Sequence, residues 1–121
     1  FANGCYTTQS RIKRGNRRLE AAFYDAEAMS ALAGQKVGFP YAKEKLTKAW
    51  EDVLFTHFHD ILTGSCVQDS REHAMGLFQT SMATANTQIT NAMRVIAEKI
   101  DTSSIPVDID AYNRRRRRLR H

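Results

Sequence analysis

The chain has 121 residues, of which 42% are hydrophobic and 26% are charged, as is typical of one soluble globular domain. Its formal net charge of +5 divides into +2 over residues 1–100 and +3 over residues 101–121, where Arg114–Arg118 form an arginine block. Because the main part of the chain is nearly balanced in charge, a nucleic-acid-binding fold is disfavoured. No apolar run approaches the roughly 20 residues of a membrane helix, so we expect no membrane partner.

The first predicted helix begins at about residue 10, after nine residues without helical periodicity. Ser10 is the expected N-cap, and Gly34 is the expected end because glycine tolerates the left-handed conformation that terminates helices. Gly15 inside the helix costs about 1 kcal/mol relative to alanine, so it marks either close packing or a later helix start. Apolar residues at spacings of three, four and seven define the buried face: Ile12, Leu19, Phe23, Ala26, Met29 and Ala33.

The second predicted helix covers residues 42–58, after a loop over residues 34–42 in which glycines and a proline interrupt helix formation. Trp50 lies on its apolar stripe, so we expect this indole to fill the bundle core. The stretch "DILTGSC", residues 60–66, is expected to end the helix. The stripe consists of Leu46, Ala49, Trp50, Val53, Leu54 and Phe58.

The third predicted helix is the longest and covers residues 68–100, with Asp69 or Ser70 as its expected N-cap. A helix of this length spans roughly 45 Å at 1.5 Å per residue, which suits the spine of a bundle or a domain packed against something larger. Its predicted face consists of Leu77, Phe78, Ser81, Ala85, Ile89, Ala92, Met93, Ile96 and Ile100.

The predicted fold is all-α, an antiparallel three-helix bundle with a long third helix and an irregular tail. We divide the chain into a helical domain, residues 1–101, and an irregular basic tail, residues 102–121, whose arginine block has a cloning remnant as one possible origin. The segment "IPVDID" within the tail is compatible with a short strand. Because the chain begins at Phe1 and lacks a signal-cleavage pattern, we expect a piece excised from a longer protein.

The chain has two cysteines, Cys5 and Cys66, which match no C-x-x-C motif and are too few for a disulfide-stapled domain. We therefore expect a reducing compartment and a cytoplasmic location, while a Cys5–Cys66 bridge stays open. The methionines at positions 29, 75, 82 and 93 are expected to fill the core.

The stretch "FTHFHDILTGSC", residues 55–66, holds two histidines one residue apart, His57 and His59, followed by Asp60. On a helix these imidazoles point about 200° apart, so they cannot share one metal ion, whereas in an extended segment they lie on the same side. A catalytic zinc ion requires at least three protein ligands, and this stretch offers at most His57, His59 and Asp60. The residues by themselves therefore favour the other interpretation, a polar helix end with local hydrogen bonds.

Two other kinds of site receive less support from the residues. Ser65 and Cys66 with His59 and Asp60 supply the residue types of a nucleophilic triad, but the loop has no Gly-x-Ser-x-Gly elbow. The run "RIKRGNRR", residues 11–18, has five basic residues. It predicts a solvated helix face, with an anion-binding or partner-docking surface as the alternative, and has no interleaved aromatics for stacking bases.

Two stretches together resemble a known family: "CYTTQSRIKRGNRRLEAAFYDAEAMSAL", residues 5–32, and "KLTKAWEDVLFTHFHDILTGS", residues 45–65. They are similar to the middle, three-helix domain of bacterial-type α-mannosidases of glycoside hydrolase family 38. The more specific part is the segment from Phe58 to Ser65, in which Thr63 replaces a proline often found in the family. The resemblance covers roughly residues 1–100.

The resemblance implies a retaining α-mannosidase that hydrolyses terminal α-mannosides with a zinc ion bound to the sugar hydroxyls. By position, His59 corresponds to the one zinc ligand contributed by the middle domain and Asp60 to a contact with the sugar hydroxyls, while His57 has no matched role. The remaining zinc ligands, one His and two Asp, and both catalytic carboxylates belong to an N-terminal catalytic domain. That domain and C-terminal β-domains are the expected partners.

No catalytic residue is therefore expected in this chain, which alone should be inactive and bind zinc weakly or not at all. The alternative function is a free-standing helical interaction module that binds a partner or nucleic acid through its basic residues.

Overall fold

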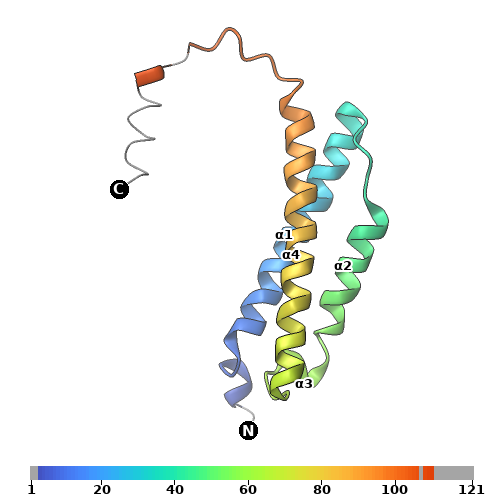
Figure 1. Ribbon diagram of the computed structural model, residues 1–121, viewed down its shortest axis with the longest axis vertical. Coiled ribbons are helices and arrows are strands. Elements are labelled where there is room, and N and C mark those ends of the chain that lie inside the picture. The colour runs from blue at the N-terminus through green and yellow to red at the C-terminus, as the bar shows by residue number, and fades with distance from the viewer. Residues whose placement is uncertain (1–2, 107, 111–121) are drawn as a thin grey trace.

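The computed structural model describes residues 3–106 and 108–110, and it confirms the all-α bundle. A short 3₁₀ helix, η1 (Asn3–Tyr6), precedes α1 (Ser10–Val37). Helix α2 (Lys43–Phe55) runs antiparallel to α1, and α4 (Gln68–Ala97) runs parallel to α1 beside both (Figure 1). A single helical turn, α3 (His59–Leu62), lies at the end of the bundle where α2 leads into α4 (Figure 1).

The bundle is built on matching seven-residue repeats in its two long helices. The buried residues of α1 and α4 recur at alternating spacings of four and three, the pattern of helices that pack side by side at a shallow angle. Small residues hold many of these positions, so α1 and α4 approach closely and share the most extensive interface of the bundle. The buried residues are Ile12, Asn16, Leu19, Phe23, Ala26, Ser30 and Ala33 in α1 and Ala74, Phe78, Ser81, Ala85, Gln88 and Ala92 in α4.

Gly15 is a point of close packing between these helices. A Cβ atom on Gly15 would lie 2.9 Å from the Cδ2 atom of Phe78, closer than such atoms approach in folded proteins. Since α1 begins at Ser10, the alternative of a later helix start is wrong.

The ends of α1 differ from the sequence prediction at both sides. Gln9, with a φ of 51°, precedes the first turn and makes no side-chain capping bond, so Ser10 is not the N-cap. The helix also continues through Gly34 and ends at Gly38, whose φ of 72° is the left-handed conformation that glycine adopts without strain. The amide of Gly38 then donates to the carbonyl of Gly34 at 3.1 Å. The sequence prediction named only Gly34 and placed Gly38 in the following loop, so the helix is four residues longer than predicted.

The apolar stripes predicted for α2 and α4 extend too far. Helix α2 ends at Phe55 rather than residue 58, and Leu54 and Phe58 are exposed. Helix α4 ends at Ala97 rather than residue 100, and both Met93 and Ile100 are exposed. In a three-helix bundle each helix has only two neighbours, so the outer residues of a wide stripe are left uncovered.

The start of α4 and the position of Trp50 also differ from the sequence prediction. Val67 precedes α4 and no side chain caps the helix, so neither Asp69 nor Ser70 is the N-cap. The indole of Trp50 lies at the edge of the core, with its ring centre 4.7 Å from that of Phe23 and its Nε1 donating to Glu27 Oε1 at 2.8 Å.

After α4 the chain continues without regular secondary structure as far as Pro106, whereas Ile109 and Asp110 are helical, so the prediction of an irregular tail is wrong for these two residues (Figure 1). Over residues 101–106 and 108–110 no strand forms, so the strand interpretation of "IPVDID" fails there, while Val107 lies outside the described residues. The arginine block Arg114–Arg118 also lies outside them, and the division at residue 101 stays a prediction. Among the helices that the structure describes, none combines the length and the apolar character needed to cross a membrane.

Candidate functional site

The candidate site is the turn that joins α2 to α4. After α2 ends, Phe58 adopts an extended conformation with φ −48° and ψ 134°, which breaks the helix. Its carbonyl accepts the amides of Ile61 and Leu62 at 2.9 and 3.0 Å, so the chain becomes helical again for one turn. Gly64, with a φ of 84°, then ends the turn. His59 and Asp60 are consequently the first two residues of α3, which the sequence predicted as a break.

The side chains of His59 and Asp60 project from this turn into solvent. They are 78% and 60% exposed, with His59 Nε2 3.7 Å from Asp60 Oδ1. The imidazole also packs on the ring of Phe58, with the ring centres 4.3 Å apart. Ile61, by contrast, is buried and fixes the turn to the bundle. An imidazole nitrogen and a carboxylate are therefore presented together at one end of the domain.

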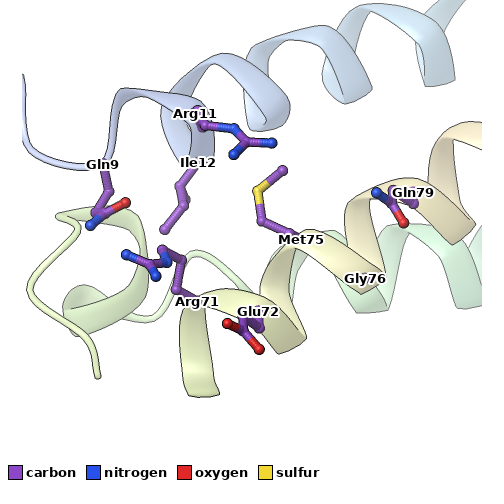
Figure 2. Close-up of a pocket in the computed structure, with 8 residues that line it drawn as sticks. All are labelled: Gln9, Arg11, Ile12, Arg71, Glu72, Met75, Gly76 and Gln79. Carbon is purple, nitrogen blue, oxygen red and sulfur yellow. The ribbon is translucent and has the colours of Figure 1, made fainter. Parts of the chain in front are cut away.

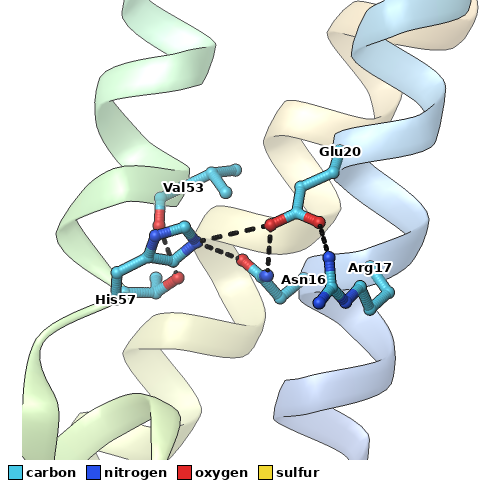
Figure 3. A network of polar contacts seen from close by, with 6 residues as sticks. Asn16, Arg17, Glu20, Val53 and His57 are labelled. Atoms are coloured by element: carbon cyan, nitrogen blue, oxygen red, sulfur yellow. Dashed lines mark hydrogen bonds and ion pairs between the residues drawn. The ribbon is translucent and has the colours of Figure 1, made fainter.

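His57 points the other way, towards α1 (Figure 3). Its Nε2 lies 2.6 Å from the Oδ1 atom of Asn16 and 4.0 Å from Glu20 Oε1. Because the chain is extended at Phe58 between two helical turns, neither geometry considered from sequence applies to the two histidines. His57 and His59 do not converge, and His57 joins the segment between α2 and α3 to α1.

Helix α1 also holds the far side of the turn. Lys13 Nζ donates to the carbonyls of Thr8 and Thr63 at 2.7 and 3.1 Å. A Cβ atom on Gly64 would lie 2.6 Å from the Thr8 carbonyl oxygen, so only glycine fits there. The turn is thus bound to α1 on both sides, by His57 before it and by Thr63 after it, while Gly64 lies against the residues that precede α1.

Sequence reasoning missed this function of α1. Lys13 and Asn16 fall within the run "RIKRGNRR", which was predicted to be a solvated basic face. That prediction is wrong for these two residues, although Arg17 in the same run is 83% exposed. The spacing of Lys13, Asn16 and Glu20 places all three on one side of a helix, but spacing alone does not show that the side faces another segment.

The structure does not hold a complete metal site in the part of the chain that it describes. Within residues 3–106 and 108–110, no group of three or more His, Cys, Asp or Glu side chains could hold a metal ion. Zinc needs at least three protein ligands in a catalytic site. His59 nevertheless fits the role of one ligand, since its imidazole is exposed and next to a carboxylate.

The arrangement disfavours a nucleophilic triad. Ser65 Oγ lies 2.9 Å from Thr63 Oγ1 and 3.4 Å from the carbonyl of Asp60, and these contacts stabilise the turn without activating a nucleophile.

Cys5 and Cys66 are both free thiols, so the bridge left open from sequence is not formed.

Two hollows lie near this end of the bundle. One, between the first turns of α1 and α4, is not lined by His59 or Asp60 (Figure 2); its lining residues are Gln9, Arg11, Ile12, Arg71, Glu72, Met75, Gly76 and Gln79. The other adjoins the candidate site, because Asp60 lines it together with the exposed apolar residues Phe55, Phe58 and Val67. Exposed apolar surface next to exposed polar residues is typical of a surface that contacts another part of a protein.

Residues 1–96 match the family described as the alpha mannosidase middle domain, and the chain belongs to this family. It is 38% identical to human alpha-mannosidase 2C1 over 91 residues, which covers 74% of this chain and 9% of that protein. It is 40% identical to the mouse alpha-mannosidase 2C1 over 64% of this chain and 8% of that protein. Alpha-mannosidase G of Dictyostelium discoideum is 34% identical over 77% of this chain and 8% of that protein. No solved structure matches the chain significantly.

The chain spans less than a tenth of the length of these relatives. The resemblance predicted from residues 5–32 and 45–65 is thereby confirmed at the level of the family. The roles of individual residues are a separate question.

Proposed function

We propose that this domain completes the active site of a zinc-dependent, retaining α-mannosidase. In this proposal His59 is one zinc ligand and Asp60 contacts the hydroxyls of the mannose being cleaved. The observation that carries it is the exposed His59–Asp60 pair on a turn bound to α1 on both sides, in a chain of the alpha mannosidase middle domain family.

The residues of the turn are suited to these tasks. The imidazole of His59 has a ring nitrogen that can bind a metal ion, and its exposure allows ligands from another domain to approach it. The carboxylate of Asp60 accepts hydrogen bonds from sugar hydroxyls, since an ionised carboxylate is an acceptor only. When bound, zinc would supply a positive charge that binds and orients those hydroxyls.

The other parts of the site belong, in this proposal, to other domains of the same protein. A retaining glycosidase uses two carboxyl groups about 5 Å apart, and we assign both, with the remaining zinc ligands, to an N-terminal catalytic domain. C-terminal β-domains are the further expected partners. The small share of its relatives that this chain spans and the apolar hollow beside Asp60 support a surface that other domains cover.

The test uses the full-length mannosidase that carries this domain. We expect His59→Ala to lose most of its bound zinc and most of its kcat/KM on an aryl α-mannoside. Asp60→Asn should retain zinc and lose kcat/KM. His73→Ala is the matched control, because His73 is also an exposed histidine but lies in α4, where its ring contacts Phe55. Zinc content and rate close to the unaltered enzyme in His59→Ala would contradict the proposal.

The isolated 121-residue chain provides a second test. Since it contributes only His59 to the proposed zinc site, it should bind zinc weakly and should not hydrolyse an aryl α-mannoside. Turnover by this chain that His59→Ala abolishes would show that the catalytic groups lie within it, contrary to the proposal.

A further inference from the structure

A buried polar residue lies in the hydrophobic face of α1. Asn16 occupies a position of the seven-residue repeat between Ile12 and Leu19, and only 6% of its surface is exposed. An amide at such a position costs free energy unless its polar atoms have partners. Buried polar groups with fixed partners can select one arrangement of helices over others.

The amide of Asn16 has a partner for each of its ends (Figure 3). Its Nδ2 donates to Glu20 Oε1 at 2.8 Å, while its Oδ1 is 2.6 Å from His57 Nε2. Arg17 holds the other oxygen of Glu20, with Nη1 donating to Oε2 at 2.8 Å. Because Oδ1 can only accept, this network assigns the hydrogen to Nε2 of His57. In this hydrogen bond His57 Nε2 is therefore the donor and Asn16 Oδ1 the acceptor.

The hydrogen bond between Asn16 and His57 holds the chain two residues before His59. Only Phe58 separates His57 from His59, and Phe58 is the extended residue that directly precedes α3. A rotation of the chain at His57 would therefore move α3, whose first two residues are His59 and Asp60. An active site needs its binding groups held within a fraction of an ångström, and residues outside the site provide that support.

We propose that Asn16 and His57 are positioning residues that fix the orientation of His59 and Asp60 for zinc and substrate. This inference rests on the proposed function of His59 and Asp60. Neither Asn16 nor His57 touches the metal or the sugar in this proposal, and both act through the direction of the turn.

The experiment compares two substitutions of His57 in the full-length enzyme. His57→Gln retains an N–H donor at a similar distance from the main chain, so it should keep zinc affinity close to that of the unaltered enzyme. His57→Phe retains a ring but no donor, and it leaves Asn16 Oδ1 buried without a partner. We expect it to weaken zinc binding by about tenfold or more, measured by competition with a chromophoric chelator, and to lower kcat/KM.

A second variant separates positioning from stability. In His57→Phe/Asn16→Leu both polar partners are removed, so the buried contact becomes apolar and much of the lost stability should return. If the hydrogen bond positions the turn, zinc affinity stays low in this double variant although its unfolding temperature recovers. If zinc affinity instead rises and falls with the unfolding temperature through the series, the two residues are only structural and the inference is wrong.

His59→Ala in the same series distinguishes this inference from the proposed function. If His59→Ala retains zinc, the proposed function fails, and with it the inference. If His59→Ala loses zinc while His57→Phe binds it as tightly as the unaltered enzyme, the inference alone is overturned.

Discussion

The interface between α1 and α4 and the turn at α3 are built from different kinds of residue. The interface is mainly buried apolar side chains, many of them small, such as Ala26, Ala33 and Ala85, with a few buried polar residues among them. The turn at α3 exposes an imidazole, a carboxylate and large apolar rings, and it is held by a few directional polar contacts from α1. The difference indicates that packing determines the stability of this domain, whereas polar contacts determine the geometry of its candidate site. The comparison can be tested by substitutions that affect one region and leave the other unchanged.

The largest effect on stability is expected in the core. Phe23 is fully buried and packs on Trp50, so Phe23→Ala should lower the free energy of unfolding by about 3–5 kcal/mol. Urea unfolding of the 121-residue chain measures this. A loss below about 1 kcal/mol would show that the core is loosely packed at Phe23.

A smaller effect is expected where the two helices touch. Gly15→Ala adds a methyl group that would meet the ring of Phe78 at 2.9 Å, and overpacking of this kind costs about 1–3 kcal/mol. The higher helix propensity of alanine would by itself add about 1 kcal/mol of stability. A net stabilisation in urea unfolding would therefore mean that the ring of Phe78 moves aside easily.

At the turn, Gly64→Ala is expected to cost about 1–3 kcal/mol, because a non-glycine residue at positive φ is strained and its Cβ would press on the carbonyl of Thr8. In the full-length enzyme the same variant should also weaken zinc binding, since Gly64 joins the end of the turn to the residues before α1. Ala33→Gly is the control for zinc binding, because Ala33 is buried near the other end of α1 from Lys13 and Asn16, and glycine in a helix costs about 1 kcal/mol relative to alanine. Equal zinc affinities at equal losses of stability would remove the distinction between the two regions.

The smallest effect is expected on the outer surface of α2. Leu54 is 55% exposed, so Leu54→Gln should change the free energy of unfolding of the chain by no more than about 0.5 kcal/mol. A loss comparable to that of Phe23→Ala would mean that α2 is packed more deeply than the structure shows.

Helix type and number were predictable because apolar periodicity reports which residues face a common core. Most of the buried face of α1, from Ile12 to Ala33, follows from it, although the prediction left out the buried polar residues Asn16 and Ser30. The periodicity does not tell how wide a face the neighbours cover, and for that reason Leu54, Phe58, Met93 and Ile100 were assigned to the core although they are exposed. The end of α1 was predicted at Gly34 but lies at Gly38, because a glycine can also stand inside a helix at a cost of about 1 kcal/mol and does not by itself end it.

The candidate residues His59 and Asp60 could be named from sequence because they stand in the segment that resembles the family to which the chain belongs, and their roles stay a proposal. Nothing local in the sequence could link them to Lys13, Asn16 or Glu20, which lie about 40 residues earlier in α1. Sequence by itself determined the all-α class, the three long helices and the family. Tertiary structure alone decided that His57 turns towards α1 while His59 turns to solvent, because that choice depends on a hydrogen bond between residues distant in the chain.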